Sequence, residues 1–234
     1  MSGKTLADFP ISKRWPPVNP DAIQLYAFPT PNGVKASIML EETGLPYDPH
    51  TVKLSETTTP EFLSLNPNNK IPAIIDPNGP DGGPFALWES GAILIYLAEK
   101  TGKFLPEEPV RRYETIQWLM FQMGGVGPFF GQYGFFGVFG GKDIEDPRPR
   151  ERYRKEAIRL LNVLEGRLKD RQWIMGDDYT IADIAIGPWV RTAKTHYDAY
   201  DAFEMDKVPS VMAWLDRFLA RPAVQRGLVQ PPRE

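Results

Sequence analysis

The residues best suited to chemistry lie in the segment Phe28-Pro29-Thr30-Pro31-Asn32-Gly33, between two regular patterns. The apolar residues 23–27 favour a short β-strand, and the spacing of apolar residues over 34–43 favours a helix. A strand-to-helix turn would place the Thr30 hydroxyl and the Asn32 amide at a helix N-terminus. That end carries unpaired N–H groups and about half a positive charge, so it favours an anion. On composition alone, an ordinary turn that starts a helix explains the segment better.

Composition excludes several kinds of site. The chain has 234 residues, a net charge of −3, no cysteine and two histidines, His50 and His196. Without cysteine there can be no disulfide and no thiolate metal site, and two histidines exclude a His-rich one, so we expect no metal. The net charge gives no electrostatic case for nucleic acid, which requires a basic face. The N-terminal sequence MSGKTLADFPISKRW has no apolar core of signal-peptide length, so the expected location is the cytoplasm.

The segment Met123–Gly141 requires a separate test, because it is uncharged and rich in Phe and Tyr. A membrane-spanning helix needs about 20 predominantly apolar residues. Here glycine recurs throughout, and each interior glycine costs a helix roughly 1 kcal/mol relative to alanine. We therefore expect no membrane span, and interpret residues 124–141 as the aromatic end of a helix followed by a loop.

The order of the patterns predicts two domains. Residues 1–20 are polar and interrupted by prolines, which indicates an extended arm on the body or on a partner, or a disordered terminus. Residues 21–101 alternate in the order β-α-β-α-β-β-α, which predicts a small open sheet with helices on its faces. Residues 102–110 form a linker, and 111–225 are helical in period, with expected helices at 111–123, 150–169, 181–189 and 209–220. The remainder, 226–234, is a C-terminal tail. The expected strands are 23–28, 50–54, 71–75 and 85–88, and the first domain's helices are 34–43, 60–65 and 90–101.

Over residues 21–225 this arrangement resembles the cytosolic glutathione transferases. Thr30-Pro31-Asn32-Gly33 and Asn66-Pro67-Asn68-Asn69-Lys70-Ile71-Pro72-Ala73 are the specific motifs, and Glu89-Ser90-Gly91-Ala92-Ile93 supports them. Together they are similar to the bacterial nu-class branch, whose known members are glutathione-dependent disulfide-bond reductases related to a fungal nitrogen-regulatory prion protein. The resemblance implies an α/β thioredoxin-like N-terminal domain plus an all-α C-terminal helical domain, and glutathione as co-substrate.

The resemblance makes the anion near Thr30 and Asn32 a glutathione thiolate, with these two residues as the catalytic pair. A free thiol has a pKa of about 8.5, and lowering this pKa by about two units requires roughly 2.7 kcal/mol. One hydrogen bond to a charged group contributes about 1.5–3 kcal/mol and a helix N-terminus about 0.3–2 kcal/mol, so no general base is required. Because the chain has no cysteine, two glutathione molecules would carry both electrons.

The resemblance also implies contacts along the rest of glutathione. Ile71 would pair through its backbone with the cysteinyl part, next to a cis Ile71–Pro72 bond, whereas the residues alone favour an ordinary trans bond. Lys70 would lie near the glycine carboxylate, although a solvated surface lysine explains it almost as well. Asn32 would also belong to the glutathione-binding set.

Three further residues complete the expected binding set. Ser90 would hold the γ-glutamyl carboxylate at a helix N-terminus, and Glu89 would take the α-ammonium group. A simple N-cap role for Ser90 is compatible with this. Arg152 aligns with an arginine that relatives present from the neighbouring subunit, but a solvated arginine on a charged helix is an equally good reading.

The sequence departs from the family pattern at two places. Thr57 stands where relatives carry Gln, which could remove one glutathione contact, and the aromatic stretch Phe129–Phe139 replaces relatives' His and Asn. Tyr26 is the fallback for thiolate stabilisation, although strand alternation points it away from the turn. Thr180-Ile181-Ala182-Asp183 is a capping box and resembles the family's folding motif, so Asp183 is expected to be structural.

Three functions remain open at this point. The leading one is a glutathione-dependent disulfide-bond oxidoreductase that binds two glutathiones, or oxidised glutathione, per subunit. The alternatives are a transferase that conjugates glutathione to small electrophiles or reduces peroxides, and a glutathione-binding regulator with little turnover. A homodimer is expected from the resemblance; the natural substrate and the redox poise are not written in the sequence.

Overall fold

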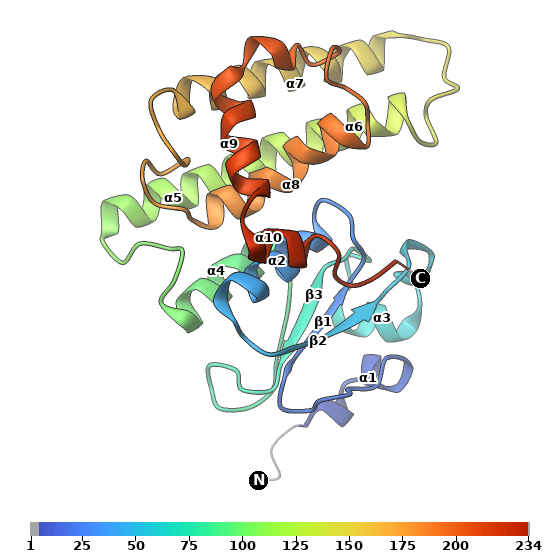
Figure 1. Ribbon diagram of the computed structural model, residues 1–234. Coiled ribbons are helices and arrows are strands. Elements are labelled where there is room, and N and C mark those ends of the chain that lie inside the picture. The colour runs from blue at the N-terminus through green and yellow to red at the C-terminus, as the bar shows by residue number, and fades with distance from the viewer. Residues whose placement is uncertain (1–4, 234) are drawn as a thin grey trace. The chain divides into compact units, whose positions relative to one another are not determined.

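The computed structural model describes residues 5–233 and separates into two compact units (Figure 1). The first unit extends to Thr101 and also contains the chain from Pro222 onward, whereas the second is Gly102–Arg221. The sequence had assigned residues up to 225 to the helical domain. In the structure, residues 222–225 pack with the first unit instead.

The first unit is built on a four-stranded sheet in the order β2-β1-β3-β4. Its strands are β1 (Ile23–Ala27), β2 (Tyr47–Thr51), β3 (Ala73–Asp76) and β4 (Phe85–Trp88). Strands β1 and β2 are parallel, whereas β3 is antiparallel to both β1 and β4. The order β-α-β-α-β-β-α is confirmed. Strand β2 begins three residues before the expected 50–54 and contains Pro49, which an edge strand tolerates.

Helices cover the sheet. They are α2 (Gly33–Thr43), α3 (Pro60–Leu65) and α4 (Ser90–Thr101). Helices α2 and α4 pack against each other, and Gly44 closes α2 in the left-handed conformation at φ 75°, which glycine adopts without strain. Phe62 and Leu65 of α3 join a buried cluster with Tyr26, Ala73 and Ile75 from the strands.

The N-terminal segment is folded, which corrects the expectation of an extended arm or a disordered terminus for residues 5–20. It forms a 3-10 turn, Leu6–Asp8, and a short helix α1, Ile11–Arg14. Phe9 and Ile11 are buried in the same cluster as Tyr26, and the Trp15 indole Nε1 donates to the Thr51 carbonyl at 3.1 Å. These apolar side chains anchor a segment whose prolines had suggested an arm. Residues 1–4 lie outside the described part of the chain.

The C-terminal segment returns to the first unit. Helix α10 (Pro222–Gly227) packs against α2. The Ser37 hydroxyl donates to the Gly227 carbonyl at 2.7 Å, and the Arg226 guanidinium pairs with Glu41 at 2.6 Å. Farther along, the Thr51 hydroxyl donates to the Pro232 carbonyl at 3.1 Å.

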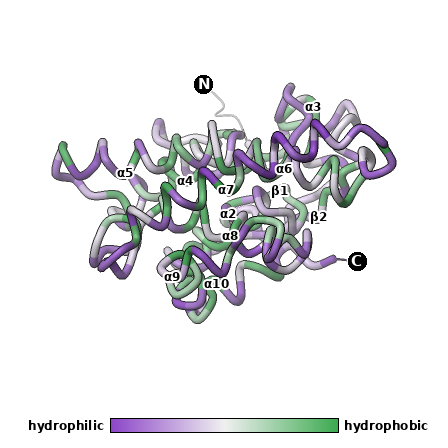
Figure 2. Tube along the Cα trace, turned by 90° about the horizontal axis from the view of Figure 1, so that it is seen from above, coloured by the Kyte–Doolittle hydropathy of each residue, from purple (hydrophilic) through white to green (hydrophobic). Residues whose placement is uncertain are grey.

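The second unit is helical. Its helices α5 (Pro109–Phe121), α7 (Arg148–Leu168) and α9 (Pro209–Leu219) lie close to the ranges that the periodicity predicts, and α8 (Ile181–Thr195) continues beyond the expected 181–189. The hydropathy trace shows hydrophilic and hydrophobic turns within the same helix, as in α5 (Figure 2). Helix α8 is buried along nearly its whole length, as its apolar sequence predicts.

The glycine-rich aromatic stretch is helical as far as Gly137, and residues 138–141 after it form turns, in line with the expected helix end followed by a loop. A π-helical segment, Gln122–Val126, leads directly into α6 (Gly127–Gly137). A methyl group added at Gly131 would lie 3.3 Å from the Trp189 ring, and one added at Gly134 would lie 2.4 Å from the Tyr197 ring. These glycines therefore let α6 pack closely against Trp189 of α8 and Tyr197 just after it. This packing offsets the low helix propensity of glycine. Among the described residues, no helix is long and apolar enough to cross a membrane.

The capping box at the start of α8 is confirmed. The Asp183 carboxylate accepts from the backbone N–H groups of Thr180 at 2.9 Å and Ile174 at 3.0 Å, and from the Trp214 indole at 2.8 Å. Asp183 is completely buried, and burial raises its pKa to about 6. These bonds tie the start of α8 to α9 and to the preceding loop, which is a structural role.

Candidate functional site

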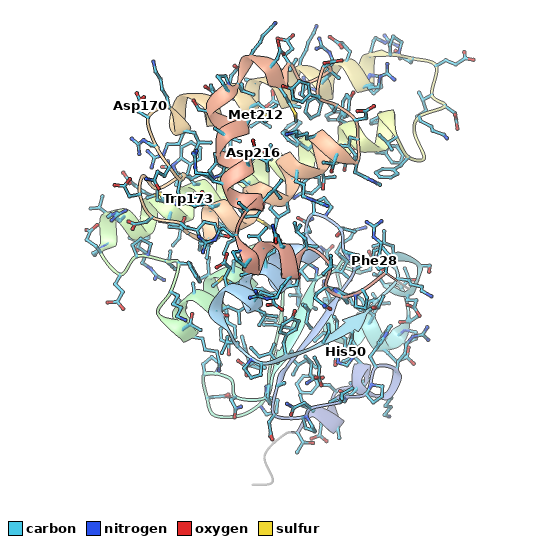
Figure 3. All side chains as sticks on the ribbon, viewed as in Figure 1. Phe28, His50, Asp170, Trp173, Met212 and Asp216 are labelled. Carbon is cyan, nitrogen blue, oxygen red and sulfur yellow. The ribbon has the colours of Figure 1, made fainter. Side chains whose placement is uncertain are left out.

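The register of the sheet brings three of the sequence motifs to one end of the first unit. Tyr26 pairs with Ala73, and Ala73 pairs with Trp88. Three chain segments therefore leave the sheet at the same end: the one after Tyr26, the one before Ala73 and the one after Trp88. These are the turn 28–33, the Ile71–Pro72 pair and the Glu89–Ser90 pair; Phe28 marks the beginning of the turn in Figure 3.

Thr30 organises the start of α2. Its carbonyl accepts from the Val34 N–H at 3.0 Å, and its hydroxyl oxygen accepts from the Gly33 N–H at 3.2 Å. Thr30 thereby performs the capping function that Asn32, which has helical dihedrals and no side-chain cap bond, does not. A hydroxyl that accepts through its oxygen can still donate its hydrogen. The partly exposed Thr30 can therefore donate to an anion at this helix end.

Gly33 fixes how closely this turn folds back on itself. A Cβ atom at this position would lie only 1.9 Å from the Phe28 carbonyl oxygen. Only glycine allows this approach without moving the backbone. The turn that presents Thr30 therefore depends on the absence of a side chain three residues later.

Ile71 and Lys70 lie on the loop that enters β3. The Ile71–Pro72 bond is cis, as the family resemblance had indicated. The Asn66 side-chain amide donates to the Lys70 carbonyl at 2.6 Å and so holds the loop just before Ile71. The Ile71 side chain is buried in the cluster described above, while Lys70 is exposed. Sequence reasoning did not identify Asn66 as the residue that orders this loop.

Glu89 and Ser90 form the start of α4. The Glu89 carbonyl accepts from the Ile93 N–H at 2.9 Å, so Glu89 occupies the cap position and Ser90 is the first helical residue. Glu89 has a φ of 73°, a left-handed conformation that costs a non-glycine residue about 1–3 kcal/mol and is frequent at functional sites. The Glu89 side chain is exposed, whereas Ser90 is only 4% exposed.

Lys35 links the two helix starts, and sequence reasoning missed it. Its side chain is completely buried, and its Nζ lies 3.2 Å from the Ser90 hydroxyl oxygen. Burial lowers the pKa of the Lys35 ammonium to about 7, and the nearby Glu89 carboxylate acts in the opposite direction. One signal was present: helical spacing puts Lys35 on the same face as the apolar Ile38 and Met39, where a lysine is unusual.

The C-terminal segment also reaches the turn. The Arg233 guanidinium donates to the Pro29 carbonyl at 3.3 Å. Nothing in the local sequence around residue 29 indicates this partner, because it lies at the other end of the chain.

Two secondary expectations have clear structural settings. Tyr26 is completely buried and stacks on His50, with ring centroids 4.7 Å apart, and burial raises its pKa to about 12. This environment does not present its hydroxyl to a ligand. The Thr57 hydroxyl donates to the Leu54 carbonyl at 3.0 Å and is buried, so it is used within its own loop. Arg152 is exposed on α7 of the second unit.

Comparison with protein families decides the relationship. A model described as glutathione S-transferase, N-terminal domain, matches residues 21–99, and one described as glutathione S-transferase, C-terminal domain, matches residues 129–222. The chain belongs to the glutathione S-transferase family. The fold is that of this family, a thioredoxin-like sheet domain followed by a helical domain.

Several relatives of this transferase-family enzyme are similar over nearly their whole length. The disulfide-bond oxidoreductase YfcG of Escherichia coli is 44% identical over 211 residues, which cover 89% of this chain and 95% of the relative. A glutathione transferase from Burkholderia graminis, solved with two glutathione molecules per subunit, is 60% identical with a TM-score of 0.97, covering 100% of this chain and 98% of that one. One from Pseudomonas putida, solved with one glutathione disulfide per subunit, is 57% identical with a TM-score of 0.95, covering 97% and 100%.

Proposed function

We propose that this protein is a glutathione-dependent disulfide-bond oxidoreductase that binds two glutathione molecules, or one oxidised glutathione, per subunit. The observation that supports this proposal most directly concerns the Thr30 hydroxyl. Its oxygen accepts a hydrogen bond from the Gly33 N–H at the start of α2, so the hydroxyl can donate its hydrogen to an anion. The relatives support the ligand: the similar Burkholderia and Pseudomonas enzymes hold two glutathiones or a glutathione disulfide.

The proposed reaction needs no protein thiol. The thiolate of one bound glutathione attacks a sulfur of the substrate disulfide, forms a mixed disulfide and releases a substrate thiolate. The thiolate of the second glutathione then attacks the glutathione sulfur of the mixed disulfide. Oxidised glutathione forms and the second substrate thiolate leaves. Two glutathiones lose two electrons and two protons, and the reduced substrate gains both.

The catalytic roles fall to Thr30 and Asn32 in this proposal. The Thr30 hydroxyl donates to the attacking thiolate, and the N–H and side-chain amide of Asn32 lie at the same helix end. A hydrogen bond to a charged group contributes about 1.5–3 kcal/mol, which corresponds to a shift of about one to two units in the thiol pKa. The positive end of α2 adds to this stabilisation.

The rest of glutathione would extend across the same end of the sheet. The Ile71 backbone would pair with the cysteinyl part, and Lys70 would face the glycine carboxylate. The γ-glutamyl carboxylate would lie at Ser90, with Glu89 facing the α-ammonium group. Arg152 would reach glutathione from a second subunit, which makes a homodimer part of the proposal.

Replacing Thr30 tests the proposal. In Thr30→Val, which keeps the shape but removes the hydroxyl, we expect the pKa of the bound glutathione thiol to rise by about one to two units and disulfide reductase turnover at pH 7 to fall at least about tenfold. Thr30→Ser, which keeps a hydroxyl, is the matched control and should retain most of the activity. Thiolate absorbance near 240 nm and reduction of a model disulfide provide the two readouts.

The competing functions give different results in the same assays. Faster turnover of an aromatic halide or a peroxide than of the disulfide would favour a conjugating or peroxide-reducing transferase. Glutathione binding with no turnover of any of these substrates would favour a regulator. Wild-type thiol pKa and turnover in Thr30→Val would contradict the role assigned to Thr30.

A further inference from the structure

Lys35 is unusual because a completely buried lysine requires compensation. Its side chain is 0% exposed on the first turn of α2, among apolar neighbours that include Ile38 and Met39. Lysine is almost never fully buried unless its charge is paired, because leaving water penalises the ammonium group. Its position next to the start of α4 gives a reason for that placement.

The contact with Ser90 has a defined direction. An ammonium group only donates hydrogen bonds, so at 3.2 Å the Lys35 Nζ donates and the Ser90 oxygen accepts. A hydroxyl oxygen that accepts a hydrogen bond in this way can also donate its own hydrogen. Ser90 is the first residue of α4, where backbone N–H groups also favour an anion. Lys35 thus adds a positive charge behind an anion-binding end and sets the polarity of its hydroxyl.

Charged groups lie on the elements that pack against α2. Among the charged groups on the elements packed against α2, Glu89 precedes α4, Glu99 and Lys100 lie at the far end of α4, and Arg226 of α10 is paired with Glu41. Strand β1 contributes only Gln24 and Tyr26. Burial lowers the pKa of Lys35 to about 7, and Glu89 is the group whose charge opposes this shift. A carboxylate bound at Ser90 would act in the same direction as Glu89.

We propose that Lys35 is a positioning residue for the γ-glutamyl end of glutathione: it orients the Ser90 hydroxyl toward the ligand carboxylate, and carboxylate binding draws a proton onto Lys35. The inference rests on the function proposed above. Its consequence is that affinity for the peptide part of glutathione decreases as the pH rises through and above 7, for a reason that is independent of the thiol. Well below pH 7 the ammonium is already charged, so this effect no longer changes the affinity there.

S-methylglutathione separates this effect from thiol chemistry, because it keeps both carboxylates but has no ionisable thiol. Calorimetric titrations of the intact protein between pH 6 and 8.5, in two buffers with different ionisation enthalpies, report both affinity and proton uptake. For the wild type we expect net proton uptake on binding at pH 7.5, and a loss of affinity of roughly threefold to tenfold between pH 6.5 and 8.5.

Two variants sharpen the test. Lys35→Met has a similar length without a charge, so we expect weaker binding at pH 6.5 and neither the proton uptake nor the additional loss of affinity at higher pH. Lys13→Met makes the same chemical change at an exposed lysine of α1 and should behave as wild type. Subtracting the Lys35→Met profile removes the titration of the ligand's own amino group, which all the proteins share.

The outcomes distinguish the two levels of the proposal. If the wild type binds neither glutathione nor S-methylglutathione, the proposed function fails. If it binds both but takes up no proton at pH 7.5, Lys35 does not have the assigned role, whereas the function stands. The absence of proton uptake in the wild type would overturn the role of Lys35 even if Lys35→Met does not fold. A folded Lys35→Met with the wild-type pH profile would also overturn the inference.

Discussion

Two hydroxyl groups of the first unit, on Thr30 and Ser90, are used in the same way. Each accepts a hydrogen bond through its oxygen, Thr30 from the Gly33 N–H and Ser90 from Lys35. A hydroxyl that accepts in this way can also donate its hydrogen, and each of the two lies at the beginning of a helix. At the scale of single residues, the proposed site centres on two hydroxyl groups that each accept a hydrogen bond within the first unit and can donate to an anion.

Asp183 provides a residue-scale prediction about pH. Its pKa is raised from 3.8 to about 6 by burial in the folded protein. Its contribution to stability is therefore fully present below the unfolded pKa and is lost as the pH rises through 6. Asn at this position does not titrate, so the unfolding free energy of the wild type minus that of Asp183→Asn should decrease by about 2–3 kcal/mol between pH 4 and 7.

Urea unfolding at several pH values, followed by tryptophan fluorescence, measures this difference. Asp183→Asn should also be less stable than the wild type at pH 7, because the amide N–H₂ would face either the Thr180 N–H or the donors of Ile174 and Trp214. A difference that does not change with pH would contradict the raised pKa.

At the scale of elements, the site depends on where helices begin rather than on their surfaces. Helices α2 and α4 start at the same end of the sheet because β1 and β4 both end there, and both flank β3. The close turn at Gly33 sets the beginning of α2, and the strained Glu89 sets the beginning of α4.

Glycine-to-alanine changes test this view at two positions with opposite expectations. Gly33→Ala would place Cβ against the Phe28 carbonyl, so we expect a loss of about 1–3 kcal/mol in stability and a lower affinity for glutathione. Gly166→Ala, in α7 with nothing within 4 Å of the added atom, should stabilise the protein by about 0.5–1 kcal/mol. Thermal unfolding and glutathione titration of both variants provide the comparison. Equal stability changes of the same sign would refute the assigned role of Gly33.

At the scale of the whole molecule, the first unit is completed by both ends of the described chain. The N-terminal turns pack on one part of its core, and the segment from Pro222 packs along α2 and reaches Pro29. The unit is therefore not a continuous stretch of sequence. It combines the chain up to Thr101 with the chain from Pro222 onward, and the whole second unit lies between these two parts in the sequence.

Truncation of the C-terminal segment tests this completion. Removing residues 222–234 uncovers the α2 face around Ile38 and deletes the bonds from Ser37 to Gly227 and from Arg226 to Glu41. We expect faster hydrogen exchange in α2 and a lower melting temperature, with the helical unit exchanging as in the full chain. Removing only residues 231–234 deletes the contacts of Pro232 and Arg233 but keeps α10, so it should leave the protection of α2 largely intact. Unchanged exchange in the longer truncation would show that α10 does not support α2.

The sequence by itself determined the features that are local. The order of strands and helices in the first unit, the C-cap at Gly44 and the capping box of Thr180 and Asp183 follow from periodicity and from residues a few positions apart. The family resemblance added the cis bond before Pro72. These features are encoded where they occur, so a reading of neighbouring residues can find them.

Only the tertiary structure decided the features that join distant parts of the chain. Lys35 meets Ser90, α10 meets α2 and Arg233 meets Pro29, although each pair is far apart in sequence. Residues 5–20 and α6 are ordered by burial against partners that local propensity does not register, including Tyr26 for the former and Trp189 for the latter. The physical reason is the same in each case. The energy that fixes these elements comes from packing and hydrogen bonds to distant residues, and it outweighs the local preferences of proline and glycine.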